Sequence, residues 1–528
     1  MTVISPSSAR PGVRTSYERR WWILAILAVS QLMIVVDASI VNIALPHAQQ
    51  ALHITTANRQ WVITAYTLTF GGLLLLGGRI ADYVGRKRIL LIGLLGFAGA
   101  SALGGLAPDA TLLFAARALQ GGFAALMAPA ALSLITVTFT EPHERARAFG
   151  VWGAIAGGGL AIGLILGGVL TQYASWRWCL LVNTPIALIA GIAALRLIPE
   201  SRVPGHTRYD IPGALTSTLG MVTLVYGVTK ASTDGWGSAS TMELLALAVA
   251  LLVAFVVIER FSAHPLLPLR VITERNRGGS YLATGLVGLG LLGTFLFLTY
   301  YLQGTLHYSA LKTGFAYLPF SVGIVIGAAV ASQLTVRLPP RVIMSVGLAG
   351  AVLGVLWFSR IGVHSDYWTH LFPAEIIMSI GMGMVFVPVN NTALTGVAPS
   401  DAGVASALIN TTQQIGGSIG TALLNTIAAT ATVTYLHARG LASATGGTAG
   451  LSTRTAATVT SATVHGYSVA FLFSAGILAL ALVTVAVLID SKATSTEPTT
   501  PLAADGADED GDIGGSGTGE LAPSMFGV

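Results

Sequence analysis

The stretch "GGRIADYVGRKR", residues Gly77 to Arg88, joins two apolar runs and is the most specific signal in the sequence. Its glycines allow close packing where the first run ends, and Asp82 can cap a helix or pair across the turn. The basic residues Arg86, Lys87 and Arg88 hold such a turn on one side of a membrane. A plain topology signal needs only a basic cluster. The fixed order of glycine, acid, glycine and basic residues is more than topology requires, and it favours a functional loop.

The composition of the whole chain explains why this turn borders a membrane. The 528 residues are 53% hydrophobic and only 10% charged, with a mean hydropathy of +0.73. A soluble domain has about 25% charged residues. The bilayer is therefore the expected solvent. The net charge of +5 is carried by short loops between apolar runs, which argues against a nucleic-acid partner.

Apolar segments long enough to cross a bilayer recur along the chain, and about fourteen are expected. We place them at residues 21–45, 60–79, 89–107, 111–135, 147–170, 177–198, 212–230, 242–260, 278–303, 312–334, 342–361, 370–393, 403–429 and 466–490. The sequence thus predicts an all-α polytopic membrane protein. An even number of spans places both termini on the same side.

Basic residues decide which side that is. They gather in the termini and in the loops after spans 2, 4, 6, 8 and 10: Arg86, Lys87, Arg88, Arg145, Arg147, Arg202, Arg208, Arg270, Arg275, Arg277, Arg337 and Arg341. The positive-inside rule then makes both termini cytoplasmic in a plasma (inner) membrane protein. The polar, basic start of the chain is unlike a cleavable signal peptide.

A weak internal similarity between residues 77–93 and 331–347 suggests two halves of the chain with spans 7 and 8 inserted between them, and composition shifts mark the tails. We expect a cytoplasmic segment at 1–20, a six-helix bundle at 21–200, two additional spans with linkers at 201–275, a second six-helix bundle at 276–490 with an external loop at 430–465, and a disordered acidic cytoplasmic tail at 491–528.

The turn at residues 77–88 resembles the signature loop of the major facilitator superfamily. Further stretches resemble its fourteen-span drug:proton antiporter branch, the EmrB/QacA type: "DASIVNIALP" (37–46), "RALQGGFAALMAP" (117–129), "SWRWCLLVNTP" (175–185), "HPLLPLR" (264–270) and "GVASALINTTQQIGGSIGTAL" (403–423). The resemblance runs from about residue 21 to 490. Its signature-loop positions match Gly78, Asp82, Gly85, Arg86, Lys87 and Arg88.

This resemblance implies a fold and a function. The fold is two pseudo-symmetric six-helix bundles, here with two extra central spans. The function is secondary active export of lipophilic, often cationic, small molecules or antibiotics in exchange for protons by alternating access, by a monomer without cofactor. Two alternatives remain: an uncoupled facilitator or lipid exporter of the same fold, and a transport-derived sensor or scaffold. No ATP-binding loop, metal-ligand cluster or nucleophile with a placed base supports an enzyme.

Asp37 is a carboxylate within an apolar run, and it should have a partner. It lies about 8 residues, roughly 12 Å, before the external end of span 1, and Arg117 lies about 6 residues, roughly 9 Å, from the same surface in span 4. We expect them to pair, with Asp37 carrying the proton and Arg117 tuning it. A purely structural ion pair that fixes helix register is the alternative.

Glu375 in span 12 is the other intramembrane acid. It could hold a cation or carry a second proton, or it could be a partly hydrated acid near the pore mouth. Glu243 and Glu259 stand at the ends of span 8, where hydration is easy, and carry little functional weight. The single cysteine, Cys179, is expected to be a small apolar core residue.

Span 5 contains a series of glycines that predicts a close helix contact: Gly153, Gly157, Gly159, Gly163 and Gly167. The series resembles the antiporter motif of the family, which has a proline directly after the glycine at Gly163. Here that position is Leu164, so the packing face is retained and the proline-linked bend is not.

Substrate contacts are expected from helices that line a central cavity. The candidates are Asn42, Trp61, Tyr66, Gln120, Tyr300 and Gln303. Aromatic faces suit lipophilic cations. The amides of residues 410–417 could line a polar wall or bond neighbouring helices.

Overall fold

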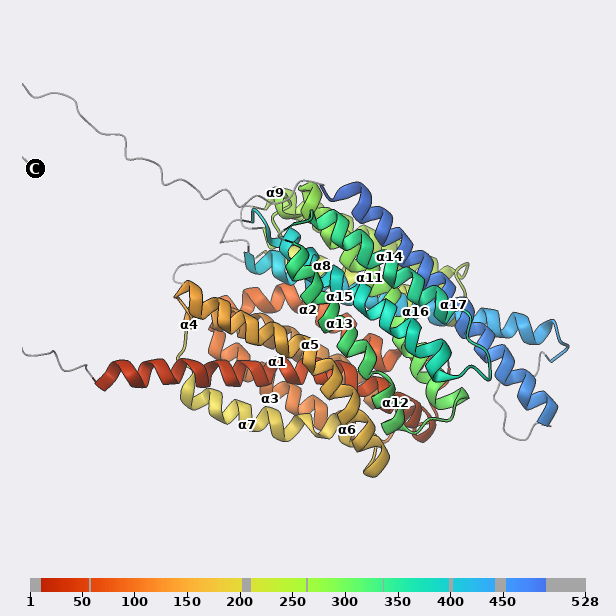
Figure 1. The fold of residues 1–528 in the computed structure, drawn as a ribbon. Coiled ribbons are helices and arrows are strands. Elements are labelled where there is room, and N and C mark those ends of the chain that lie inside the picture. Colours follow the sequence, from red (N-terminus) through yellow and green to blue (C-terminus); the bar gives the residue numbers. More distant parts are fainter. Residues whose placement is uncertain are drawn as a thin grey trace, which may run out of the picture. The chain divides into compact units, whose positions relative to one another are not determined.

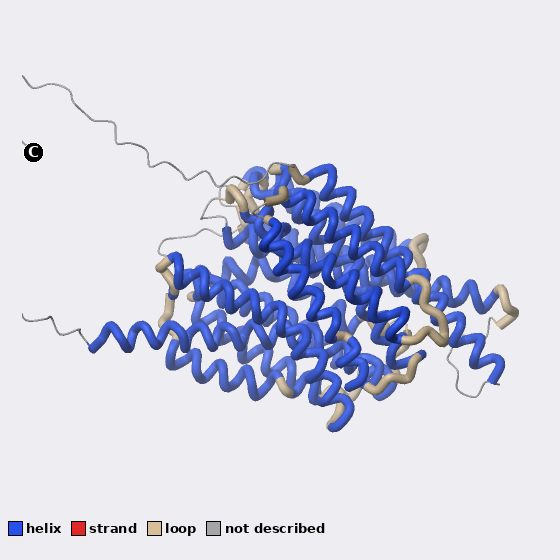
Figure 2. The backbone as a smooth tube through the Cα atoms, viewed as in Figure 1, coloured by secondary structure: helices blue, strands red, loops and turns tan. Residues whose placement is uncertain are grey.

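A backbone inside a bilayer can satisfy its hydrogen bonds only within a helix or a closed barrel, so apolar runs of this length should be helical. The structure is a computed structural model that describes residues 11–56, 58–201, 210–262, 265–335, 337–397, 402–441 and 453–490. In these ranges every regular element is a helix (Figure 2). The expected tail, residues 491–528, lies outside the described residues.

The first part of the chain forms seven helices. They are α1 (Pro11–Ala51), α2 (Trp61–Val84), α3 (Arg86–Gly105), α4 (Ala110–Thr138), α5 (Pro142–Tyr173), α6 (Trp178–Leu181) and α7 (Asn183–Leu197). Local chemistry sets several ends. Asp109 caps α4 by accepting a hydrogen bond from the Leu112 N–H at 2.9 Å. Helix α7 ends at Leu197, and the next residue, Ile198, has an extended backbone.

Two helices, α8 (Ile211–Asp234) and α9 (Ala239–Phe261), follow and pack against each other. Asp210 and Ser238 cap their N-termini through the N–H groups of Gly213 and Thr241. These helices coincide with the two extra spans expected from the sequence.

The rest of the chain is again helical. Its elements are α10 (Arg270–Thr273), α11 (Arg275–Tyr300), the π-helix η1 (Tyr301–Thr305), α12 (Ala310–Ala316), α13 (Leu318–Leu334), α14 (Pro340–Phe358), the π-helix η2 (Tyr367–Leu371), α15 (Phe372–Leu394), α16 (Ala402–His437) and α17 (Thr453–Leu488).

Two expected spans are broken by proline. Span 6 divides between α6 and α7 because Pro185 has no N–H to donate to the carbonyl of Leu181, and span 10 divides at Tyr317 because Pro319 likewise cannot donate to Phe315. The expected external loop is shorter than the sequence suggested. Helix α16 continues to His437 and α17 already begins at Thr453.

Eleven stretches among the described residues are long and apolar enough to cross a membrane. Each of them coincides with an expected span. Helices α2 and α5 contain shorter apolar stretches, Trp61–Leu74 and Gly158–Tyr173, and α8 is not among the eleven. The chain is thus a multi-pass membrane protein, and the count of fourteen spans stays a prediction.

Packing partners fall into two groups (Figure 1). Helices α1 to α7 pack mainly on one another, as in the pairs α2–α4, α3–α4 and α1–α5, and helices α11 to α17 do the same, as in α14–α15, α11–α16 and α13–α15. The groups meet where α2 packs on α16 and where α5 packs on α12, while α8 contacts both α2 and α16. The exact domain boundaries stay a prediction.

Candidate functional site: a buried ion pair

Asp37 of α1 and Arg117 of α4 form a buried ion pair. Asp37 is 0% exposed and Arg117 is 1% exposed, and Arg117 Nη1 donates to Asp37 Oδ2 at 2.6 Å. The depth argument from the sequence is therefore confirmed in its geometry: two charges on different helices reach the same level. The pair lies among α1, α2, α4 and α7, inside the first group of helices.

Neutral amides complete the coordination of the carboxylate. Its Oδ1 atom accepts a hydrogen bond from Gln120 Nε2 at 3.0 Å and another from Asn183 Nδ2 at 2.9 Å. Gln120 also donates to Ser101 Oγ at 2.8 Å and accepts from Arg117 Nη1 at 2.9 Å. An amide and a hydroxyl in apolar runs are the only sequence signals for Asn183 and Ser101, and both residues were missed.

Arg117 is held from two further directions. Its Nε atom donates to the Val62 carbonyl of α2 at 2.9 Å, and its guanidinium carbon lies 4.4 Å from the centre of the Tyr66 ring. Three side chains donate hydrogen bonds to Asp37, and no N–H hydrogen takes part in more than one bond of this network. This pattern suits an ionised carboxylate, which only accepts hydrogen bonds, facing a charged guanidinium.

The glycines of α5 pack against the helix that carries Asp37. A Cβ atom on Gly159 would lie 2.9 Å from Val35 Cγ1, one on Gly163 would overlap Ser39 Oγ, and one on Gly167 would lie 2.9 Å from the Ile40 carbonyl. The expected close helix contact thus exists, and its partner is α1. Gly153 and Gly157 lie on α5, but their surroundings fall outside the described residues.

Leu164, which replaces the family proline, is 1% exposed. Its carbonyl oxygen lies 2.6 Å from the place of a Cβ on Gly314 of α12. A side chain on Gly314 would therefore separate α5 from α12. This seam joins the two groups of helices directly beside the glycine face of α5.

The signature loop is anchored by an acid that the sequence analysis missed. Glu200 Oε1 accepts a hydrogen bond from the Lys87 N–H at 3.2 Å, and Glu200 Oε2 lies 3.5 Å from Arg88 Nε. Gly85 has φ of +117°, and a Cβ there would lie 2.5 Å from Glu200 Oε1. The glycine is needed both for its backbone conformation and for this approach.

Other members of the loop are less informative. The Arg86 N–H donates to the Ser201 carbonyl at 3.1 Å, and Lys87 Nζ donates to the Leu195 carbonyl at 2.8 Å. Gly78 faces Pro129 across an ordinary contact distance. Asp82 lies on α2, and its side chain falls outside the described residues.

Glu375 is not a hydrated acid at a pore mouth. It is 1% exposed, near the start of α15, and its Oε2 atom lies 3.4 Å from the Tyr367 hydroxyl. Its Oε1 atom is buried and has no hydrogen-bond partner. The helix begins only after the π-helical turn η2, so Glu375 lies deeper in the packing than its place near the end of the span suggested.

Glu259 is also more buried than its position at a helix end suggested. It is 3% exposed, and its Oε2 atom accepts the Leu267 N–H at 3.0 Å, which holds the segment after α9. Glu243 near the start of α9 is exposed, as its helix-end position predicted.

The six residues proposed to contact substrate do not form one cluster. Tyr66 and Gln120 belong to the ion-pair network. Trp61 lies against Tyr226 of α8, with ring centres 5.9 Å apart, and Asn42 donates to the Ala38 carbonyl of its own helix. The remaining two, Tyr300 and Gln303, belong to the other group of helices and contact α1 and the turn before α2.

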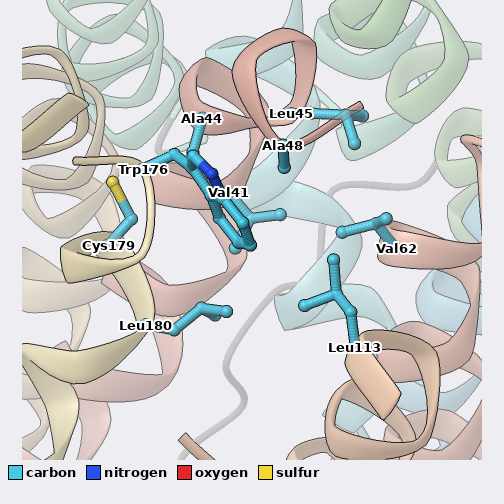
Figure 3. Close-up of a pocket in the computed structure, with 9 residues that line it drawn as sticks. All are labelled: Val41, Ala44, Leu45, Ala48, Val62, Leu113, Trp176, Cys179 and Leu180. Atoms are coloured by element: carbon cyan, nitrogen blue, oxygen red, sulfur yellow. The ribbon is translucent and has the colours of Figure 1, made fainter. Parts of the chain in front are cut away.

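Figure 3 shows a small apolar cavity whose lining includes Val41, which follows Asp37 by about one helical turn on α1. Its lining comes from α1, α2, α4, α6 and the turn before α6: Val41, Ala44, Leu45, Ala48, Val62, Leu113, Trp176, Cys179 and Leu180. Val62 connects it to the ion pair, because its carbonyl accepts from Arg117. Cys179 is buried, as expected of a core residue, and lies 3.3 Å from Thr171 Oγ1.

Comparison with known proteins shows the family of this chain. The sequence model of the Major Facilitator Superfamily matches residues 27–421. The puromycin resistance protein of Streptomyces alboniger is 49% identical over 91% of this chain and 93% of its own length. The cephamycin export protein CmcT of Amycolatopsis lactamdurans is 40% identical, covering 78% and 85%. The multidrug efflux pump LfrA of Mycolicibacterium smegmatis is 32% identical, covering 79% and 82%.

Solved structures agree on the fold. A bacterial homologue of the human lysosomal transporter Spinster superimposes with a TM-score of 0.64 at 16% identity, covering 90% of this chain and 97% of that one. At this identity the likeness concerns the fold alone. Together with the family match over most of the sequence, it leaves a single assignment: the chain is a non-enzymatic membrane transporter and belongs to the Major Facilitator Superfamily.

Proposed function

We propose that this protein is a proton-coupled exporter of lipophilic, cationic small molecules, including antibiotics. It works as a monomer in the plasma membrane with both termini in the cytoplasm. Relatives named for puromycin resistance, cephamycin export and multidrug efflux support the export of drugs. The buried ion pair of Asp37 and Arg117 supports the proton coupling.

The ion pair carries this proposal because its geometry changes with one proton. In the described conformation Asp37 accepts three hydrogen bonds and Arg117 neutralises it. A proton on Asp37 would replace one of these acceptor sites and leave Arg117 without its counter-charge. The helix packing that suits the ionised pair would then no longer suit the protonated one, which couples proton binding to a movement of α1 relative to α4.

Glu375 supplies a second proton site by a different argument. The Tyr367 hydroxyl oxygen lies 2.8 Å from the Ala316 carbonyl oxygen and 3.4 Å from Glu375 Oε2. It carries a single hydrogen, so it can donate to only one of them. When the Tyr367 hydroxyl donates its hydrogen to the Ala316 carbonyl, it can only accept from Glu375. A hydrogen bond between Tyr367 and Glu375 then requires that Glu375 is protonated and donates. The geometry therefore favours an ionised Asp37 and a neutral Glu375 in the same conformation.

The glycine face of α5 is the surface along which α1 would move. Small residues allow two helices to lie close together without interlocking side chains. The signature loop, held by Glu200, would fix the cytoplasmic end of the first bundle in one of the two states. Proton entry supplies about 2.3 kcal/mol per charge per 100 mV, with about 1.4 kcal/mol more per pH unit.

Proton exchange is tested in inverted membrane vesicles that carry an imposed pH gradient, reported by a quenched pH dye. Ethidium added to wild-type vesicles should release part of the gradient, and the variant Asp37→Asn should not respond. Glu243→Gln is the matched control, because it removes the same charge at an exposed helix end. A response that persists in Asp37→Asn would show that this residue is not the carrier.

A second function has one observation in its favour. Leu164 stands where the antiporter motif has proline, and an α5 without the proline-linked bend would fit an uncoupled facilitator or a lipid exporter of the same fold. In that case no cation would release the pH gradient from wild-type vesicles, while ethidium or a fluorescent lipid would still redistribute without a gradient.

A further inference from the structure

Polar side chains connect the two groups of helices at the ends predicted to be external. We call Gln49, Arg59, Gln60, Tyr300 and Asn425 the external clasp. The first three lie at the end of α1 and just before α2, and the others lie on α11 and α16. The Tyr300 hydroxyl donates to Gln49 Oε1, and Asn425 Nδ2 donates to Gln60 Oε1 at 2.5 Å.

Arg59 is at the centre of the clasp. It is only 5% exposed, and its guanidinium carbon lies 3.9 Å from the centre of the Tyr300 ring. Its Nε atom donates to Asn425 Oδ1 at 3.4 Å. No carboxylate among the described residues forms an ion pair with it, so an aromatic face and an amide take the place of a counter-ion.

This partner set differs from that of Arg117 in one respect: both guanidinium groups lie over a tyrosine ring, but only Arg117 also has a carboxylate partner. Arg117 faces a carboxylate, which binds it strongly in a low-dielectric interior, whereas Arg59 faces the π-electrons of Tyr300. An aromatic face attracts any cation of suitable size and is selective for none. The contact is therefore one that a second cation can take over.

We propose that Arg59 closes the external end of the transporter by covering the Tyr300 ring, and that a cationic substrate on its way out displaces it from that ring. This inference rests on the proposed export of lipophilic cations and extends it to the exit step. Two cations cannot share one ring face, because they repel each other in a buried site. Arrival of the substrate at Tyr300 then releases Arg59, which loosens its contact with Asn425 of the second bundle.

The clasp also accounts for two residues that were first assigned to substrate contact. Tyr300 supplies the ring face, and Gln303 Nε2 donates to the Ile43 carbonyl of α1 at 3.0 Å, beside the clasp. Below it, Thr67 Oγ1 and Ser418 Oγ lie 2.5 Å apart across α2 and α16. Ser418 is 0% exposed and lies seven residues, or roughly 10 Å, along α16 from Asn425.

Ser418 provides a reporter for the test. We would introduce Ser418→Cys in a Cys179→Ser background, which leaves one cysteine in the chain, and label it from outside intact cells with a membrane-impermeant thiol reagent. The proton gradient is collapsed throughout. The readout then follows access through the clasp and does not depend on Asp37.

The expected result has two parts. Arg59→Met should label about tenfold faster than the parent, whereas Arg360→Met, which removes an exposed arginine at the same end, should not. Ethidium should accelerate labelling of the parent but add nothing in Arg59→Met. Tyr300→Leu should abolish the effect of ethidium, and Tyr300→Phe, which keeps the ring face, should preserve it.

Equal labelling of Arg59→Met and the parent would overturn the closing role of Arg59. Faster labelling of Arg59→Met without any effect of ethidium on the parent would overturn displacement by the substrate. If vesicles show no proton exchange but both labelling results hold, the proton coupling fails and the clasp stands.

Discussion

Removing one partner of the Asp37–Arg117 pair should be far more damaging than removing both charges. In Arg117→Met, Asp37 keeps only the amide donors Gln120 and Asn183 in a site with no exposed surface. Breaking a buried pair in this way destabilises a protein by about 3–5 kcal/mol. That lowers the ratio of folded to unfolded molecules by about two to three and a half orders of magnitude.

Asp37→Asn should be similarly unstable for two reasons. The guanidinium of Arg117 loses its counter-charge, and the N–H₂ group of the new amide can face the N–H donors of Arg117. The double variant Asp37→Asn/Arg117→Met has no buried charge. Its main remaining losses are the Arg117 donors to the Val62 carbonyl and to Gln120 Oε1, and each acceptor left without a donor costs about 1–3 kcal/mol. We therefore expect the double variant to be more stable than either single variant.

The assay is reversible unfolding in mixed micelles with increasing SDS, combined with the vesicle measurement of proton exchange. We expect the double variant to recover most of its free energy of unfolding and none of its proton exchange. A double variant whose loss equals the sum of the single losses would refute the electrostatic reasoning. A double variant that is stable and still exchanges protons would leave Asp37 and Arg117 as a structural pair that fixes helix register.

Three further predictions concern other parts of the chain. Gly121→Ala should lower the free energy of unfolding by about 1–3 kcal/mol, because its Cβ would overlap the Tyr66 carbonyl across the α2–α4 contact. The control Gly122→Ala, whose Cβ would meet only Leu73 at 3.6 Å, should be close to neutral in the same SDS titration. Glu375→Gln should change the free energy of unfolding by no more than about 1 kcal/mol, because an amide can donate to Tyr367 as a protonated acid does. A loss of stability as large as that of Asp37→Asn would show that Glu375 is ionised. Glu200→Gln should slow transport and speed proteolytic cleavage in the signature loop. The free energy of unfolding should change little, since a partly exposed ion pair contributes only about 0–1 kcal/mol. An unchanged transport rate would show that the contact of Glu200 with the loop plays no part in the mechanism.

Much of the fold followed from the sequence because the bilayer imposes simple requirements. A span needs about 20 apolar residues, and each of the eleven described stretches that are long and apolar enough to cross a membrane coincides with an expected span. The resemblance of the loop at residues 77–88 named the family correctly. Helix interruptions were not foreseen at Val182 and Tyr317, although the prolines three and two residues later carry that signal.

The sites were foreseen unevenly. Depth along two spans was enough to pair Asp37 with Arg117, because the rise per residue of a helix is constant. Depth says nothing of which side of a helix faces which neighbour, so Asn183 and Ser101 were missed, and a hydrated position of Glu375 remained one of its two alternatives. The pairing of Arg59 with Tyr300 joins positions 241 residues apart, and no local pattern encodes it.

The sequence by itself therefore determined the solvent of this protein, its helices and the charges it keeps in the membrane, because each of these depends on residues close together in the chain. Tertiary structure alone decided that Arg117 meets a carboxylate as well as an aromatic ring, whereas Arg59 meets an aromatic ring and an amide. Both Arg117 and Arg59 are buried guanidinium groups at one end of the helices, and only the packing of distant helices gives them different partners.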